Sequence, residues 1–126
     1  MSINKLNSAI EKSEKYLEAL KMVKEVTDME AKNVYDLALQ KYILLEGTAP
    51  AAQYLNEMGY RTKGAWGDRK YISTDITKMI ENESIYDQVN PRILFLALKL
   101  RKGSAYSSRM DKLIKISSGY FEKFGN

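Results

Sequence analysis

The last third of the chain carries basic residues at the spacing of one helical face. Several of them stand three residues apart, and serines precede them where a helix would begin. The free N–H groups and the dipole of a helix N-terminus favour an anion. We therefore expect a clamp for the phosphates of nucleic acid, with ordinary helix capping and a solvated basic surface as the alternative. The residues of this predicted clamp are Arg101, Lys102, Ser107, Arg109, Lys112 and Lys115.

The distribution of charge points to the same region. Residues 84–126 carry eight lysines and arginines against three acidic residues, a net charge of +5. Residues 1–47 carry seven basic residues against eight acidic ones, and the whole chain has a net charge of +4. Positive charge concentrated in one region favours phosphate or acidic partners.

A second candidate interface lies between Ala51 and Asn82. The sequence there predicts a helix, a glycine stop, a basic turn, a serine cap and a short helix, which is the order of a helix-turn-helix with an extended turn. The second helix has no arginine, the residue that most often contacts a base specifically. We expect three of its residues to face DNA and four basic residues of the turn to lie on the DNA backbone. These are Thr74, Thr77 and Lys78 on the helix, and Arg61, Lys63, Arg69 and Lys70 in the turn.

The segment AAQYLNEMGYRTKGAWGDRKYISTDITKMIEN resembles the DNA-binding segment that follows the catalytic domain of large serine recombinases. The turn here is longer than in that family, Tyr71 stands where the family usually has Trp, and the catalytic domain with its nucleophilic serine is missing. The resemblance therefore implies the geometry of a recognition module and no recombinase activity. The alternative interpretation is a common way of ending one helix and starting another. The matching residues are Leu55, Asn56, Gly59, Thr62, Lys63, Gly64, Tyr71, Ser73, Thr74, Ile76, Met79, Ile80 and Asn82.

The composition argues against an enzyme. The chain has no cysteine and no histidine, which excludes thiol catalysis and zinc–thiolate sites and removes the commonest general base. The acidic residues Glu81, Glu83 and Asp87 are close in sequence, but we expect them around an exposed helix end. We therefore predict no catalytic residue, no metal and no cofactor.

The N-terminal segment from about Ile3 to Val26 has the clearest helical pattern. Its apolar residues follow a spacing of alternately three and four residues, which is typical of helices that pair with one another. We expect two chains to associate through Leu6, Ile10, Leu17 and Leu20. The alternative is that this stripe packs on the protein's own core. The whole stripe, in which Ser13 completes the spacing, is Ile3, Leu6, Ile10, Ser13, Leu17 and Leu20.

The remaining elements are predicted from apolar periodicity, glycines and capping residues. A second helix is expected from a cap at Thr27 or Asp28 up to about Glu46, with Leu44 among the residues that face inward. Further helices are expected over residues 49–58, 74–82, 91–102 and from Ser107 or Ser108 to about Phe121. Residues 60–72, around Trp66, are expected to form a loop or a short two-stranded wing. The sequence thus predicts an all-α single domain of residues 1–126 with five or six helices. It contains a helix-turn-helix-like segment at 48–83 and basic helices at 91–121.

The sequence predicts neither a membrane span nor a secretion signal. The longest apolar run, Ile93 to Leu98, is far below the roughly 18–20 residues that a span needs. The first residues lack the apolar block of a signal peptide. We expect a cytoplasmic protein without membrane contact.

Two functions are consistent with these patterns. The first is a transcription regulator or accessory protein of bacterial, plasmid or phage type that binds duplex DNA as a homodimer. The second is a small phage or mobile-element protein that binds and modulates a host protein without touching DNA. One continuous basic face would favour DNA, whereas scattered charges with an exposed apolar patch would favour a protein partner.

Overall fold

Helices dominate the computed structural model, which describes residues 1–103 and 106–125. The all-α prediction is therefore confirmed, and the predicted wing near Trp66 is a two-stranded antiparallel hairpin. The strands are β1 (Thr62–Gly64) and β2 (Gly67–Arg69). The helices are α1 (Ile3–Asp28), α2 (Val34–Leu45), α3 (Thr48–Glu57), α4 (Ser73–Glu81), the 3-10 helix η1 (Glu83–Gln88), α5 (Pro91–Lys102) and α6 (Arg109–Phe124).

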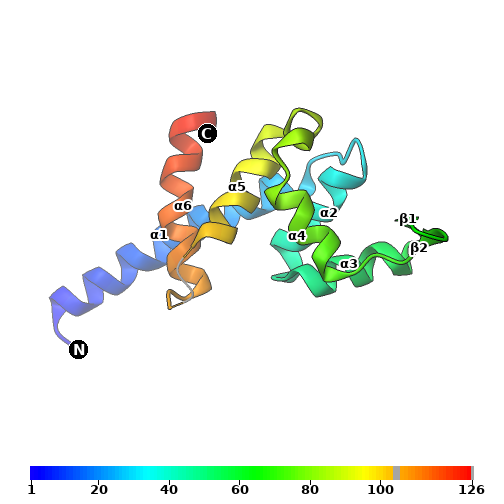
Figure 1. Ribbon diagram of the computed structural model, residues 1–126. Coiled ribbons are helices and arrows are strands. Elements are labelled where there is room, and N and C mark those ends of the chain that lie inside the picture. The colour runs from blue at the N-terminus through cyan, green and yellow to red at the C-terminus, as the bar shows by residue number, and fades with distance from the viewer. Residues whose placement is uncertain (104–105, 126) are drawn as a thin grey trace.

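Helix α5 lies at the centre of the molecule and packs against α1, α2, α4 and α6. Its side chains Ile93, Leu96, Ala97 and Leu100 are buried, as its nearly continuous apolar sequence predicts. Figure 1 shows the other elements around it, with the first half of α1 and the β1–β2 hairpin extending to opposite ends. The core therefore occupies the middle of an elongated molecule.

The helix starts agree with the predicted caps for α5 and α6 and differ for α2, α3 and α4. Helix α2 begins at Val34 and not after Thr27 or Asp28, which belong to α1, and the side chain of Asn33 caps it by accepting from the Asp36 N–H at 2.9 Å. The side chain of Asn90 accepts from the Arg92 N–H at 2.9 Å, and that of Ser108 accepts from the Asp111 N–H at 3.1 Å. Helices α3 and α4 begin one residue earlier than predicted, at Thr48 and Ser73 themselves. In α4 the capping interaction comes from inside the helix. The Asp75 carboxylate accepts from the backbone N–H of Ile72 at 2.8 Å.

The 3-10 helix η1 has no counterpart in the sequence prediction. The side chain of Asn82 starts it by accepting from the backbone N–H of Ser84 at 3.1 Å and from its hydroxyl at 2.7 Å. Ile85 is buried, and the Tyr86 hydroxyl donates to the carbonyl oxygen of Ile80 at 2.5 Å. These contacts fold the α4–α5 connection onto the core.

Helix α2 turns a partly polar face to the interior. Leu44, which the pattern placed inside, is 50% exposed, whereas Leu39 and Ile43 are buried together with Asp36 and Gln40. Gln40 explains this rotation, because its amide donates to the carbonyl oxygens at the end of α1, at 3.0 Å and 2.8 Å. A buried polar side chain is tolerated when its hydrogen bonds are made.

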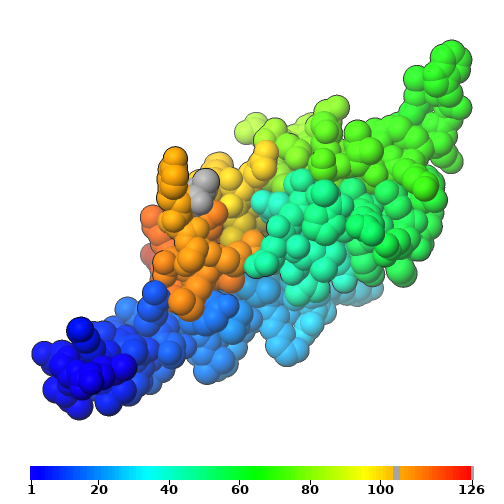
Figure 2. Space-filling view, turned by 90° about the horizontal axis from the view of Figure 1, so that it is seen from below, coloured from blue at the N-terminus to red at the C-terminus, as the bar shows by residue number. Residues whose placement is uncertain are grey.

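Helix α1 has two apolar faces, and only one of them reaches the core. Ala19, Met22 and Val26 are completely buried, whereas residues 1–15 are all exposed. Figures 1 and 2 both show this first half projecting from the body. The interpretation that the heptad stripe packs on the protein's own core is therefore wrong. Its members remain in solvent, with exposures of 44% for Leu6, 48% for Ile10, 53% for Leu17 and 42% for Leu20.

Helix α1 is also the longest element of the fold. Neither it nor any other helix within residues 1–103 and 106–125 is long and apolar enough to cross a membrane.

Replacing Asp36 by Ala should destabilise the fold by about 2–3 kcal/mol. The Asp36 carboxylate is 2% exposed and accepts from the backbone N–H groups of Asn90 at 2.8 Å and Lys32 at 3.1 Å. Alanine leaves these two donors without an acceptor, and an unmet buried donor costs free energy. Urea unfolding of Asp36→Ala should show the loss, while Asp87→Ala, an exposed control, should leave the midpoint nearly unchanged. Equal midpoints for the two variants would contradict the role of Asp36.

Candidate nucleic-acid interface

Three side chains from three helices fix α6 against α5. The Tyr120 hydroxyl donates to Glu25 of α1 at 2.9 Å, and the Arg92 guanidinium of α5 donates to the same carboxylate at 3.2 Å. Arg92 also donates to the Tyr120 hydroxyl at 3.3 Å and to the Phe124 carbonyl oxygen at 3.3 Å. Burial is the main cause that raises the pKa of Tyr120. The phenol therefore stays a donor, and the spacing of α5 and α6 is set.

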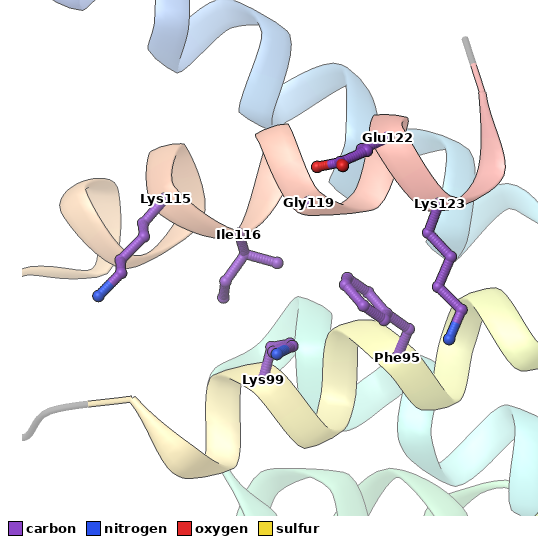
Figure 3. Close-up of a pocket in the computed structure, with 7 residues that line it drawn as sticks. All are labelled: Phe95, Lys99, Lys115, Ile116, Gly119, Glu122 and Lys123. Atoms are coloured by element: carbon purple, nitrogen blue, oxygen red, sulfur yellow. The ribbon is translucent and has the colours of Figure 1, made fainter.

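A hollow of about 520 Å³ opens between these two helices. Figure 3 shows Lys115, Ile116 and Lys123 extending from α6 on one side, with Phe95 and Lys99 of α5 opposite. Gly119 of α6 faces the Phe95 ring, and an added Cβ there would lie 3.8 Å from it. The floor is thus apolar, and the walls carry the ammonium groups of three lysines together with the carboxylate of Glu122.

A second hollow of about 360 Å³ adjoins the first and shares Lys99 and Lys115 with it. It lies toward the start of α6, and together the two hollows form one groove along α5 and α6, which we call the lysine groove. Gly103 closes this end, where the Lys112 stem passes within 3.0 Å of the place a Cβ would occupy. The second hollow is lined by Lys99, Lys102, Gly103, Ser107, Asp111, Lys112 and Lys115.

The lysines of the groove have no carboxylate partner among the described residues. Two of them, Lys99 and Lys123, lie over the Phe95 ring at 5.6 Å and 5.5 Å from its centre. Asp111, which lines the groove, is paired with Lys12 of α1 at 3.2 Å. Hydrogen bonding to Ser108 and the Lys12 ammonium hold the pKa of Asp111 below its usual value. The unpaired lysines are Lys99, Lys102, Lys112, Lys115 and Lys123.

The two arginines predicted for the phosphate clamp have partners within the chain. Arg109 donates to the carbonyl oxygen of Ile43 and pairs with Glu46 at 3.1 Å. These two contacts of Arg109 cap the C-terminal end of α2. Arg101 pairs with Glu81 of α4 at 3.5 Å. The structure therefore brings Lys102, Ser107, Lys112 and Lys115 together in the groove and places the two arginines in intramolecular contacts.

In the second predicted interface, α3–hairpin–α4, the amide of Asn56 links the end of α3 to the segment before α4. The Asn56 side chain donates to the carbonyl oxygen of Tyr71 at 2.9 Å and accepts from its N–H at 2.7 Å. Tyr71 is buried, with 7% of its surface exposed, and burial raises the pKa of its phenol. This two-point contact joins the end of α3 to the residues that precede α4.

The residues that carry the recombinase resemblance build the frame of this unit. Leu55, Ile76 and Ile80 are completely buried. Gly59 has a φ of +88°, which favours glycine, and allows the chain to reverse after α3. Asn82 starts η1. These residues therefore have structural roles within the unit, and the DNA contact itself stays a prediction.

The hairpin carries exposed basic residues and an exposed tryptophan. Trp66, between the strands at the tip, is fully exposed, and Lys63 and Lys70 are exposed as well. Arg61 is exposed but donates to the carbonyl oxygens of Asn56 at 3.2 Å and Tyr60 at 2.6 Å. The single tryptophan of the chain, bracketed by Gly64 and Gly67, was the signal available in the sequence.

Arg69 ties the hairpin to the start of α4. Its guanidinium makes two bonds to the Asp75 carboxylate, at 2.8 Å and 2.7 Å. Hydrogen bonding to Arg69 is the main cause that lowers the pKa of Asp75. As a free carboxylate, Asp75 would repel phosphates, but the ion pair with Arg69 neutralises its charge. Arg69 is in turn occupied by this pair.

The outer face of α4 is accessible as predicted. Thr74 and Lys78 are exposed, while Ile76, Met79 and Ile80 are buried on the other side. Thr77 is half-buried, and its hydroxyl donates to the carbonyl oxygen of Ser73 at 3.3 Å.

The two basic regions do not form one continuous face. Figure 1 shows the hairpin at one end of the molecule and the α5–α6 pair away from it, and Figure 2 shows the same separation. The single continuous basic face that would favour DNA is therefore not formed, and the exposed apolar stripe of α1 is a feature expected for a protein partner.

Comparison of the chain with protein-family models, curated proteins and solved structures finds no match. The resemblance to the recombinase segment thus stands on the quoted residues alone.

The Arg69–Asp75 pair should give the fold a specific dependence on acid. Because the folded pKa of Asp75 lies below its ordinary value of 3.8, its ionised form stabilises the fold at neutral pH. This contribution is lost as the pH falls through 3.8 and below. Asp75→Asn should therefore be less stable than the wild type at pH 7, with the difference shrinking in acid.

Urea midpoints between pH 7 and about pH 2.5 would measure this difference. Asp68→Asn, an exposed change in the same hairpin, is the matched control and should follow the wild type at every pH. A difference for Asp75→Asn that does not vary with pH would contradict the assignment.

Proposed function

We propose that the protein binds duplex DNA through the lysine groove between α5 and α6. The observation that carries this proposal is a set of five lysines on two adjoining hollows, none of which has a carboxylate partner within residues 1–103 and 106–125. The five ammonium groups outnumber the two carboxylates that line the groove, Glu122 and Asp111, so the local potential is positive and attracts an anion. DNA presents phosphates at regular intervals, so one strand can occupy a groove in which successive lysines are available.

We expect the contact between the lysine groove and DNA to depend on phosphate charge and not on the base sequence. Lysine acts as a compact point charge on a flexible stem, whereas arginine forms the two parallel hydrogen bonds that identify guanine. The basic residues that line the groove are all lysines. Arg101 and Arg109 beside it form ion pairs with Glu81 and Glu46. Binding should therefore release counterions and weaken steeply with salt.

The α3–hairpin–α4 unit supports a second contact that could supply sequence preference. Thr74 and Lys78 face solvent on α4, and Lys63 and Lys70 lie on the neighbouring hairpin. The acidic residue on that helix nearest its start, Asp75, is neutralised by Arg69. A small DNA-binding regulator of bacterial, plasmid or phage type would combine a charge-dependent grip with such a helix.

Arg69 has a revised role in this proposal. The sequence placed it on the DNA backbone, but its two bonds to Asp75 make it a positioning residue for the start of α4. Arg69→Ala should therefore disturb the hairpin as well as any DNA contact.

A second candidate function is binding to a host protein without DNA. The fully exposed Trp66 at the hairpin tip favours it, since exposed tryptophans are frequent anchors of protein interfaces. In that case the basic groove would have no effect on partner binding, and the protein would show no affinity for duplex DNA.

The double variant Lys102→Ala/Lys115→Ala should weaken binding to all duplex sequences alike. Both side chains are exposed in the groove, and each lost phosphate contact should lower the slope of log K against log salt by about 1. Fluorescence anisotropy with labelled duplexes at two or more salt concentrations measures this change.

The control for the groove variant is Lys5→Ala/Lys32→Ala. It removes the same charge from two exposed lysines outside the groove and the hairpin, and it should keep the wild-type slope. Absence of wild-type binding at about 50 mM salt, where phosphate contacts are strong, would refute the proposed function. Equal losses in both double variants would refute the groove as its site.

Substitutions on α4 should affect preference among sequences. Thr74→Ala and Lys78→Ala should reduce the discrimination between preferred and random duplexes by ~1–3 kcal/mol for a good base contact. They should leave the melting temperature nearly unchanged, because both side chains are exposed. Competition binding with selected and random duplexes checks this, with Gln53→Ala on the exposed face of α3 as the control. Unchanged discrimination in both α4 variants would remove α4 from the interface.

A further inference from the structure

The exposed stripe of α1 is separate from the face that anchors this helix. At 3.6 residues per turn, the residues from Ile3 to Leu20 that follow the heptad spacing lie on one side of the helix. Ala19, Met22 and Val26, which pack into the core, lie on nearly the opposite side. Packing of α1 against its own chain therefore uses one face and leaves the stripe uncovered.

The stripe stays uncovered along its full length. Ile3 is 68% exposed, and every later apolar member is more than two-fifths exposed up to Leu20. Lys24, one turn further on, is exposed as well and pairs with Asp28 at 2.5 Å. Five large apolar side chains on one helical face are more than the scattered surface hydrophobes of an ordinary monomer.

The stripe also contains a recess of the shape that helix pairing requires. A shallow hollow of about 360 Å³ is centred on the small side chain of Ser13. In paired helices, a side chain from one helix enters a hole formed by four residues of the other. The hollow is lined by Ala9, Ile10, Ser13, Glu14 and Leu17.

We propose that a second copy of this chain covers the stripe, with the two α1 helices antiparallel. In this arrangement Ile10 of each copy enters the Ser13 recess of the other. The same register sets Leu6 opposite Leu17 and Ile3 opposite Leu20, so every member of the stripe faces a member of the second stripe. The surface is thus complementary to itself.

The charged residues beside the stripe fit the antiparallel register. On one flank, Asn7 comes beside Glu14 of the second copy, an amide beside a carboxylate. On the other flank, Ala9 comes beside the half-buried Tyr16, which adds apolar contact. Neither flank sets like charges against each other.

A parallel pair fits less well. The next stripe position after Leu20 is Lys24, and parallel helices would bring the two Lys24 ammonium groups together at the seam. Ser13 would also face Ser13 and leave the recess empty. The helix dipoles would point the same way, whereas antiparallel helices set opposite partial charges beside each other.

Sedimentation equilibrium of the full chain from about 1 to 200 μM, without DNA, tests the proposal. The wild type should form dimers, and Leu17→Asp should be monomeric across the range. Leu6→Asp is a second test that lies far from the core, in the part of α1 where no side chain is buried. Ser8→Asp, which adds the same charge off the stripe, should still dimerise.

Cysteine pairs distinguish the register, because the chain has no cysteine of its own. The double variant Asn7→Cys/Glu14→Cys should give a covalent dimer on mild oxidation, while each single variant should remain uncrosslinked. The control Asn4→Cys/Glu11→Cys has the same seven-residue spacing away from the stripe and should not crosslink.

A monomeric wild type, or dimers that survive both Leu17→Asp and Leu6→Asp, would overturn the proposal. Dimers that dissociate in these variants but never crosslink through residues 7 and 14 would overturn the antiparallel register. Since all of these measurements are made without nucleic acid, their outcome is independent of the DNA-binding proposal.

Discussion

The contact among Glu25, Arg92 and Tyr120 connects the three helices on which the rest of the molecule depends. The Glu25 carboxylate of α1 accepts hydrogen bonds from the Tyr120 hydroxyl of α6 and from the Arg92 guanidinium of α5. Each of its two oxygens therefore has a donor in this partly buried place. Loss of any of the three would leave a polar group with too few hydrogen bonds. The contact fixes α6 against α5, and the width of the lysine groove follows from it. It also fixes the second half of α1 and thereby the direction in which the first half leaves the body (Figure 1).

All five arginines of the protein donate to groups of the same chain, whereas the basic residues that line the groove are all lysines. Arg69 and Arg109 stabilise the start of one helix and the end of another. The planar guanidinium suits such sites because it offers several donors in fixed directions, and lysine suits a mobile counter-charge. The arginines thus stabilise the fold, and the groove lysines supply the positive potential at the surface.

Much of the fold could be predicted from the sequence because its signals are local. Asn90 with Pro91, and Ser108 before Asp111, specify helix starts through neighbouring residues, and Gly59 specifies a helix end. The rotation of α2 could not be predicted, because it depends on Gln40 reaching carbonyl oxygens 11 and 14 residues away in the chain. The same holds for the site: the spacing of Lys112 and Lys115 indicated one face of α6, on which Lys123 also lies about two turns further on, but only the packing of α5 on α6 brings Lys99 to them. Arg109 looked equivalent to its neighbours in sequence, and its contact with Ile43 comes from 66 residues away.

The stability of α1 rises along the helix from its exposed first half toward its packed second half. No side chain before Tyr16 is even half-buried, so these turns gain little from tertiary packing. A helix is costly to nucleate and inexpensive to extend, and the nucleus here is the anchored part around Ala19 and Met22. In a single chain, the first turns therefore exist as an extension of the packed half, each depending on the one that follows it in sequence. Their backbone hydrogen bonds open from the N-terminal end, and the lifetime of each bond grows toward the core.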